Sequence, residues 1–310
     1  MIQDVRARFA IIAATLVAVL GFATAQQSTI PPAVRAATLD QAVPVDPLIT
    51  VGTLSNGMRY YIRENRQPQG RAELRLAVNA GSVLEDDDQR GLAHFVEHMA
   101  FNGTRNFPGN AVGAFMQSLG VRFGAHVNAH TGFDETVYEL QIPTDKPAVI
   151  DRSLLILEDF AHRVSFEPEE IDKERGVILE EWRLGLGASE RIQNAQFPLL
   201  FKGSRYADRL PIGNPDIIRT VSYARLRQFY TDWYRPDLMA IIVVGDIDKT
   251  TIEAQIKTRF GSIPAPASPR PRPSFTVPDQ PGTAYSVITD PETTRALVSV
   301  TNTRTAREQR

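Results

Sequence analysis

Alternating apolar positions mark short strands in the first part of the chain. Residues 48–54 and 58–62 are rich in β-branched and aromatic side chains, and Asn56-Gly57 between them is typical of a tight hairpin turn. Residues 73–78 alternate polar and apolar side chains, which predicts a third strand with one buried face. The pattern therefore predicts an antiparallel sheet here.

Helical periodicity dominates the rest of the chain up to residue 260. The pattern predicts helices at 90–101, 108–119, 147–164, 167–183, 188–202, 221–233 and 250–260. Between them, further strands are expected at 121–129, 135–142 and 238–244. The expected fold class is therefore α+β, with a mostly antiparallel sheet packed against helices.

A proline-rich stretch follows these elements and predicts an extended linker. Beyond it, residues 283–289 and 297–301 look like strands that open a second unit, which is truncated at Arg310. The predicted organisation is a signal peptide at 1–25, an extension at 26–47, a domain at 48–263, a linker at 264–282 and the truncated start of a second domain at 283–310.

The composition narrows the chemistry that the chain can perform. The 310 residues are 43% hydrophobic and 23% charged with a net charge of −2, which is an ordinary globular balance without the basic character of a nucleic-acid binder. The chain has no cysteine and five histidines. A transition-metal site must therefore be built from histidine and carboxylate.

The N-terminus has the features of an export signal. Arg6 and Arg8 precede an apolar run at 9–22, and Ala23-Thr24-Ala25 is typical of a cleavage site before Gln26. The apolar run is short for a bilayer span, which favours a cleaved signal peptide over an uncleaved anchor. We therefore expect export to the periplasm or the cell exterior, with no stable membrane span after cleavage.

The helix expected at 90–101 carries the first candidate chemistry. His94 and His98 are four residues apart, so both imidazoles lie on one helix face, and Glu97 lies beside them. Two imidazoles and a carboxylate in the order H-x-x-E-H suit a zinc ion and a nearby base. The alternative is a pair of ordinary histidines on an amphipathic helix.

Two histidines leave zinc short of protein ligands, because a catalytic site normally has three. In the helix expected at 167–183, Glu174 and Glu181 are seven residues apart and share a face. Either could supply the missing ligand. The alternative is that both are solvated charges on a surface helix.

Three stretches in this order now carry a resemblance: HFVEHMAFNGT, VNAHTGFDETVY and ERGVILEEWR. Together they resemble the pitrilysin/insulinase family of inverzincin metallopeptidases, and within it the bacterial periplasmic, PqqL-like branch. The resemblance covers about residues 48–262. It implies an α/β half-unit that is followed by a second, related half.

The resemblance also implies roles for the site residues. His94, His98 and Glu181 would bind one Zn²⁺ per chain, and Glu97 would be the general base that activates a water on the zinc. Glu174 would be an additional catalytic acidic residue that supports the site.

Asn128 and Ala129 match the family's edge strand, which holds a substrate peptide in extended form. The implied function is a zinc-dependent endopeptidase for peptides or unfolded polypeptides, completed by a second homologous half in cis or in trans. The alternatives are a non-catalytic assembly or scaffold subunit of the same family, or a peptide-binding subunit.

Overall fold

The computed structural model describes residues 44–122, 124 and 126–302. The predicted signal peptide at 1–25 lies outside the described residues, as do residues 26–43 of the predicted extension.

A six-stranded sheet forms the centre of the described fold, with the strand order β1-β2-β6-β3-β5-β4. The predicted hairpin is present, because β1 and β2 pair antiparallel with Thr53 opposite Arg59. Only β2 and β6 are parallel, and the other neighbours are antiparallel. The predicted α+β class with a mostly antiparallel sheet is confirmed. The strands are β1 (Ile49–Thr53), β2 (Arg59–Glu64), β3 (Arg71–Val78), β4 (Val127–Thr131), β5 (Thr136–Pro143) and β6 (Met239–Gly245).

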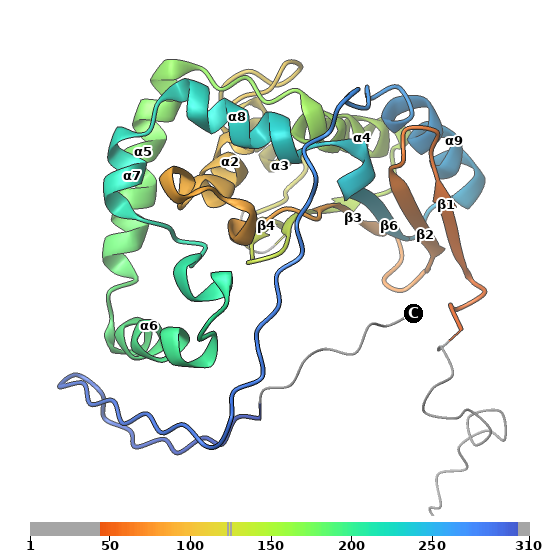
Figure 1. The fold of residues 1–310 in the computed structure, drawn as a ribbon. Coiled ribbons are helices and arrows are strands. Elements are labelled where there is room, and N and C mark those ends of the chain that lie inside the picture. Colours follow the sequence, from red (N-terminus) through yellow and green to blue (C-terminus); the bar gives the residue numbers. More distant parts are fainter. Residues whose placement is uncertain (1–43, 123, 125, 303–310) are drawn as a thin grey trace, which may run out of the picture. The chain divides into compact units, whose positions relative to one another are not determined.

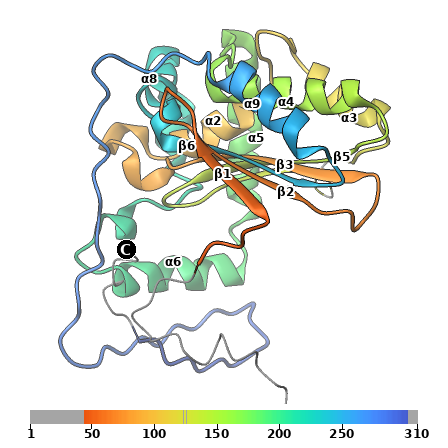
Figure 2. The same cartoon turned by 90° about the vertical axis from the view of Figure 1, so that its right-hand side faces the viewer.

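Seven of the described helices occupy the predicted regions and differ from the predicted bounds by a few residues. The sequence pattern missed α7 (Pro215–Thr220), a short helix whose first turn is capped by the Asn214 side chain, which accepts from the N–H groups of Asp216 and Ile217. The helices are α2 (Leu92–Phe101), α3 (Ala111–Ser118), α4 (Pro147–His162), α5 (Pro168–Leu184), α6 (Ala188–Leu200), α7 (Pro215–Thr220), α8 (Tyr223–Trp233) and α9 (Lys249–Phe260). Figures 1 and 2 show α4 and α9 on the same face of the sheet. Within the described ranges, no helix has both the length and the apolar character that crossing a bilayer requires.

The core lies between the helices and the sheet face on which α4 and α9 pack. Along β3, Leu74, Leu76 and Val78 are fully buried and alternate with half-buried polar or small residues, as the period of two requires. Phe95 of α2 and Trp233 of α8 are also fully buried. Each such side chain contributes about 1.5–3 kcal/mol by leaving water, so the core fixes the position of α2.

Strand β4 is shorter than the sequence pattern predicts, since it begins at Val127 and not at residue 121. Gly124 has a φ of +78° and its N–H donates to the carbonyl of Val127, 2.8 Å away. These two features form a turn, and a turn cannot continue a regular strand. The prediction of a strand from 121 was therefore wrong at the described residues 121, 122, 124 and 126.

The strands predicted at 283–289 and 297–301 are not formed in the described residues. A strand needs a partner for its backbone N–H and C=O groups. The apolar side chains of this segment are also without cover, since Val287, Val298 and Val300 are at least 90% exposed. A propensity for strand structure is not sufficient without a neighbouring strand.

The proline-rich segment is anchored to the fold and is not a free tether. The Arg270 guanidinium lies 2.7 Å from a carboxylate oxygen of Asp86 and 3.1 Å from one of Asp232. Two residues later, Arg272 donates to the main-chain carbonyl of Asn79 at 2.8 Å. These contacts hold the segment against α8 and against the loop between β3 and α2.

Two glycines fix the start of α2. Gly91, at the N-cap, has a φ of +106°, and Gly213 has a φ of +79°. A Cβ on Gly213 would lie 2.2 Å from the Cα of Gly91, which is far inside contact distance. The two backbones approach so closely that only glycine fits at these positions. This approach fixes the point at which α2 begins, and with it the position of His94 in the helix.

Candidate metal centre

Helices α2 and α5 bring three ligand atoms together. The Nε2 atoms of His94 and His98 are 3.0 Å apart, and Glu181 Oε2 lies 3.7 Å from the first and 3.5 Å from the second. The three residues form a group whose ligand atoms all lie within 4.8 Å of one another. The spacing of four in α2 and the packing of α5 against it produce this convergence.

The donor set fits zinc. Nitrogen and oxygen ligands of a tetrahedral zinc ion lie about 3.3 Å from one another, close to the three separations seen here. Two imidazole nitrogens that face each other at 3.0 Å cannot both carry a proton. A cation placed among these three atoms would satisfy both nitrogens and the carboxylate.

Glu174 is held against the other ring nitrogen of His98. Its Oε1 accepts from His98 Nδ1 at 2.6 Å, and its side chain is only 12% exposed. When Nδ1 carries the proton, Nε2 is free of it and faces the other two ligand atoms. Glu174 therefore sets the tautomer and the ring orientation of His98.

The two imidazoles differ in basicity. Burial and the nearby charge of His98 hold the pKa of His94 below its usual value. Burial also lowers the pKa of His98, but the hydrogen bonds to Glu174 and Glu181 outweigh it and raise that pKa to about 9. His98 is therefore the more basic of the two rings, because the carboxylates of Glu174 and Glu181 both lie against it.

Glu97 lies on α2 beside these ligands and is 8% exposed. Its Oε2 accepts a hydrogen bond of 2.6 Å from the hydroxyl of Thr131 in β4. Burial raises the pKa of Glu97, and the bond from Thr131 partly offsets this. A buried carboxylate whose pKa is displaced toward neutrality suits a general base.

Asn128 and Ala129 lie on β4, the last strand of the sheet, next to the metal centre. They pair with Glu139 and Tyr138 of β5 on one side, and within the described sheet β4 has no neighbour on its other side. A hollow of about 300 Å³ lies here. It is lined by residues that include Glu97, His98, Phe101, Asn102, Asn128, Ala129 and Glu174.

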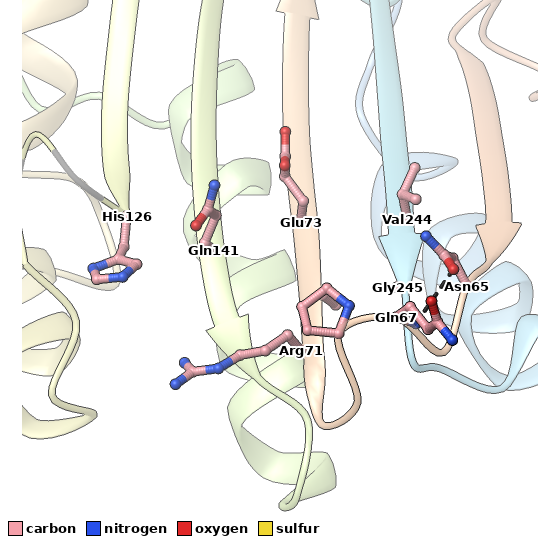
Figure 3. A pocket seen from close by; sticks show the side chains of 10 residues that line it. Asn65, Gln67, Arg71, Glu73, His126, Gln141, Val244 and Gly245 are labelled. Carbon is pink, nitrogen blue, oxygen red and sulfur yellow. Dashed lines mark hydrogen bonds between the residues drawn. The ribbon is translucent and has the colours of Figure 1, made fainter. Parts of the chain in front are cut away.

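A second hollow of about 350 Å³ lies away from these groups, near the ends of β3, β5 and β6 (Figure 3). Arg71, Gln141 and His126 line it, but none of the candidate ligands does. Glu73, which also lines it, pairs with Arg75. Size alone therefore does not mark the functional site, and the smaller hollow beside α2 is the better candidate.

Arg175 connects α5 to neighbouring segments and so helps to fix the position of α5, the helix that carries Glu181. Its guanidinium donates to the main-chain carbonyls of Ile218 and Val221 at 2.5 and 2.6 Å. It also lies 5.8 Å from the centre of the Phe95 ring in α2. One side chain thus connects α5 with the end of α7 and with α2.

Glu85 forms a hydrogen bond with the first turn of α2. Its Oε1 accepts from the main-chain N–H of Ala93 at 2.8 Å, and the residue is fully buried. Burial raises the pKa of this carboxyl to about 8, against the opposing effects of the backbone N–H groups and of Arg209 and Arg205.

The raised pKa of Glu85 predicts a pH dependence of stability. The folded state holds a proton that the unfolded chain releases above about pH 4.5, so the free energy of unfolding should fall as the pH rises from about 5 to 8. The loss should reach a few kcal/mol, since each pKa unit corresponds to about 1.4 kcal/mol.

Urea unfolding of the metal-free chain at several pH values measures this effect. Glu85→Gln should remove most of the decline, whereas Glu169→Gln, an exposed carboxylate in α5, should leave it unchanged. The same slope in wild type and in Glu85→Gln would contradict the assignment.

The structure brings all five predicted acidic and histidine residues into one centre: His94, Glu97, His98, Glu174 and Glu181. It also adds two residues that sequence reasoning did not select. Thr131 contacts Glu97, and Asn102 Nδ2 donates to Glu174 Oε2 at 2.7 Å. In the sequence, Thr131 is a turn residue and Asn102 a helix end, so their residue types gave no signal of these contacts.

Comparison with known protein families decides the relationship of the chain. A model of insulinase (peptidase family M16) matches residues 60–184, and a model of the peptidase M16 inactive domain matches residues 220–303. The chain belongs to peptidase family M16. The resemblance drawn from the three sequence stretches is confirmed. The inactive-domain model begins at residue 220 and so includes β6. In the structure, however, β6 belongs to the same sheet as β3, β4 and β5, which the insulinase model covers.

Named M16 relatives include proteins described as zinc proteases. The chain is 41% identical over 250 residues to a zinc protease PQQL-like of Arabidopsis thaliana, with 80% of this chain and 26% of that protein covered. It is 44% identical over 224 residues to a probable zinc protease PqqL of Escherichia coli, with 72% and 24% covered. The chain spans about a quarter of the length of these relatives.

A solved M16 structure shares the fold. The first half of the periplasmic protease PqqL from Escherichia coli matches with a TM-score of 0.72 at 43% identity, covering 75% of this chain and 50% of that chain. The agreement places the six-stranded sheet and its helices in a known M16 half-unit.

Proposed function

We propose that the chain carries the zinc centre of a metalloendopeptidase that hydrolyses peptides or unfolded polypeptides. The observation that carries the proposal is the convergence of His94 Nε2, His98 Nε2 and Glu181 Oε2 beside the buried Glu97. Membership of family M16 and similarity to proteins described as zinc proteases support it.

In this proposal His94, His98 and Glu181 hold one zinc ion per chain. When bound, zinc supplies a Lewis acid that polarises the scissile carbonyl and lowers the pKa of water. Glu174 acts through the ring of His98, because it keeps the proton on Nδ1 and leaves Nε2 available.

Glu97 takes a proton from the attacking water and returns it to the leaving amine. Because burial raises its pKa, the Glu97 carboxylate can both accept a proton and give it up again near neutral pH. The Thr131 hydroxyl holds Oε2 and leaves Oε1 for the proton. Thr131 thus fixes the direction in which the base points.

The substrate main chain adds to the open edge of β4 at Asn128 and Ala129. Strand addition uses backbone hydrogen bonds and so depends little on side-chain sequence. It also requires an extended segment, which favours peptides and unfolded chains over folded proteins. The hollow beside Glu97 and His98 then receives a substrate side chain.

A second homologous half, in cis or in trans, completes the active site. The match to an M16 inactive-domain model and the division of PqqL into halves support this part of the proposal. Periplasmic export, with cleavage near Ala25-Gln26, is supported by the basic and apolar start of the sequence and by a relative described as periplasmic.

Hydrolysis of an unfolded model protein tests the function. We expect cleavage by the zinc-loaded protein, loss of cleavage with a chelator, and recovery when zinc is restored. The assay is run with the 310-residue chain alone and with a second M16 half added, because oxyanion-stabilising groups elsewhere commonly contribute orders of magnitude in rate.

The same assay separates the alternatives. Stoichiometric zinc without cleavage in either arm would favour a peptide-binding subunit. Absence of both zinc and cleavage would favour an assembly or scaffold subunit.

A further inference from the structure

Asn102, the residue at the end of α2, makes two hydrogen bonds that meet at His98. Its side-chain Nδ2 donates to the main-chain carbonyl of His98 at 3.2 Å and to Glu174 Oε2 at 2.7 Å. The residue is half-buried and also lines the hollow beside the metal centre. One amide therefore contacts the backbone of His98 and the carboxylate that holds its ring.

The two oxygens of Glu174 are divided between two partners. Oε1 faces His98 Nδ1 at 2.6 Å, and Oε2 faces Asn102 Nδ2 at 2.7 Å. A carboxylate held at one oxygen can turn about its terminal torsion, which is broad and soft. Held at both oxygens, it keeps a single orientation toward the imidazole.

We propose that Asn102 is a positioning residue of the zinc centre, which orients the Glu174 carboxylate and through it the His98 ring. The inference rests on the proposed function, because it takes His98 as a zinc ligand. Groups that orient a ligating histidine commonly change metal affinity by 10- to 100-fold. Asn102 should therefore affect zinc affinity although it offers no ligand atom to the metal.

The residue type matters for this role. The Asn102 amide is neutral and places an N–H donor at the carboxylate, whereas an aspartate of the same shape would place a second negative charge there. Asn102→Asp should thus weaken zinc binding more than Asn102→Ala, even though aspartate fills the same volume.

Zinc affinity of the full 310-residue chain, measured by competition with a chromophoric chelator, tests the proposal without any need for peptidase activity. We expect Asn102→Ala to lower the affinity by about 10- to 100-fold. In a Glu174→Ala background the same change should cost less than about threefold, because the carboxylate through which Asn102 acts is gone.

A reversed pair gives a second test that preserves shape. In the double variant Asn102→Asp/Glu174→Gln, the new amide donates to the new carboxylate, and its carbonyl oxygen still accepts from His98. We expect affinity at least about tenfold above that of Asn102→Asp alone, since the hydrogen-bonded chain is restored with the same total charge.

Asn106 provides the matched control. Four residues further on, its Nδ2 donates to Asp159 Oδ1 at 2.8 Å, a bond of the same kind away from the metal centre. Asn106→Ala should leave zinc affinity unchanged.

Three outcomes would overturn the inference: equal affinity in wild type and Asn102→Ala, the same loss with and without Glu174, or no recovery in the reversed pair. A wild-type chain that binds no zinc would instead overturn the proposed function.

Discussion

Glu97→Gln is expected to lower kcat for peptide hydrolysis by about 10²–10⁴-fold while zinc remains bound. Glutamine has the shape of glutamate but cannot accept a proton at neutral pH. Because Glu97 is buried and hydrogen-bonded to Thr131, the substituted side chain should keep its place. KM should change little, since Glu97 acts on the attacking water and not on substrate binding.

Steady-state kinetics and metal analysis on the same samples check this result. Glu180→Gln is the matched control, because Glu180 is an exposed carboxylate that pairs with Arg183 in α5. Its kcat should equal that of the wild type. Full activity in Glu97→Gln would show that another group takes the proton, and loss of zinc would show that Glu97 supports the metal.

His94→Ala, His98→Ala and Glu181→Gln are each expected to reduce zinc affinity by more than roughly a hundredfold, beyond the effect of removing a supporting group. Each change removes one of three converging ligand atoms. With two protein ligands left, the coordination that zinc prefers is incomplete. Peptide hydrolysis should be lost in parallel.

Thermal unfolding with and without zinc gives an independent measure. A ligand present at a thousand times its Kd stabilises the folded state by about 4 kcal/mol, and a hundredfold loss of affinity reduces this to about 1.4 kcal/mol. The three variants should therefore lose most of the zinc-dependent rise in Tm.

His126→Ala is the control for an imidazole outside the centre, because His126 lines the other hollow. It should keep the zinc-dependent rise in Tm. Wild-type zinc content in any of the three ligand variants would refute the assigned ligand set.

The sequence determined the features that depend on local geometry. The spacing of four between His94 and His98 and of seven between Glu174 and Glu181 fixes which side chains share a helix face. Strand alternation likewise predicted β3 and its buried face. The same reasoning left open whether Glu174 or Glu181 would supply the third ligand atom beside the two histidines. The resemblance to a family, and not the spacing, selected Glu181.

Only the tertiary structure decided the features that depend on distant partners. β6 lies between β2 and β3, far from both in sequence, because packing and strand pairing place it there. Residues 283–301 have strand-like composition, but without a partner they form no strand in the described structure.

The contacts that orient the metal centre are also tertiary. Asn102 meets Glu174 across 72 positions of sequence, and Thr131 meets Glu97 across 34. The sequence by itself determined which helix faces carry the candidate ligands. The packing of α5 and β4 against α2 decided which residues hold those side chains in place, because hydrogen bonds between distant segments exist only once the chain has folded.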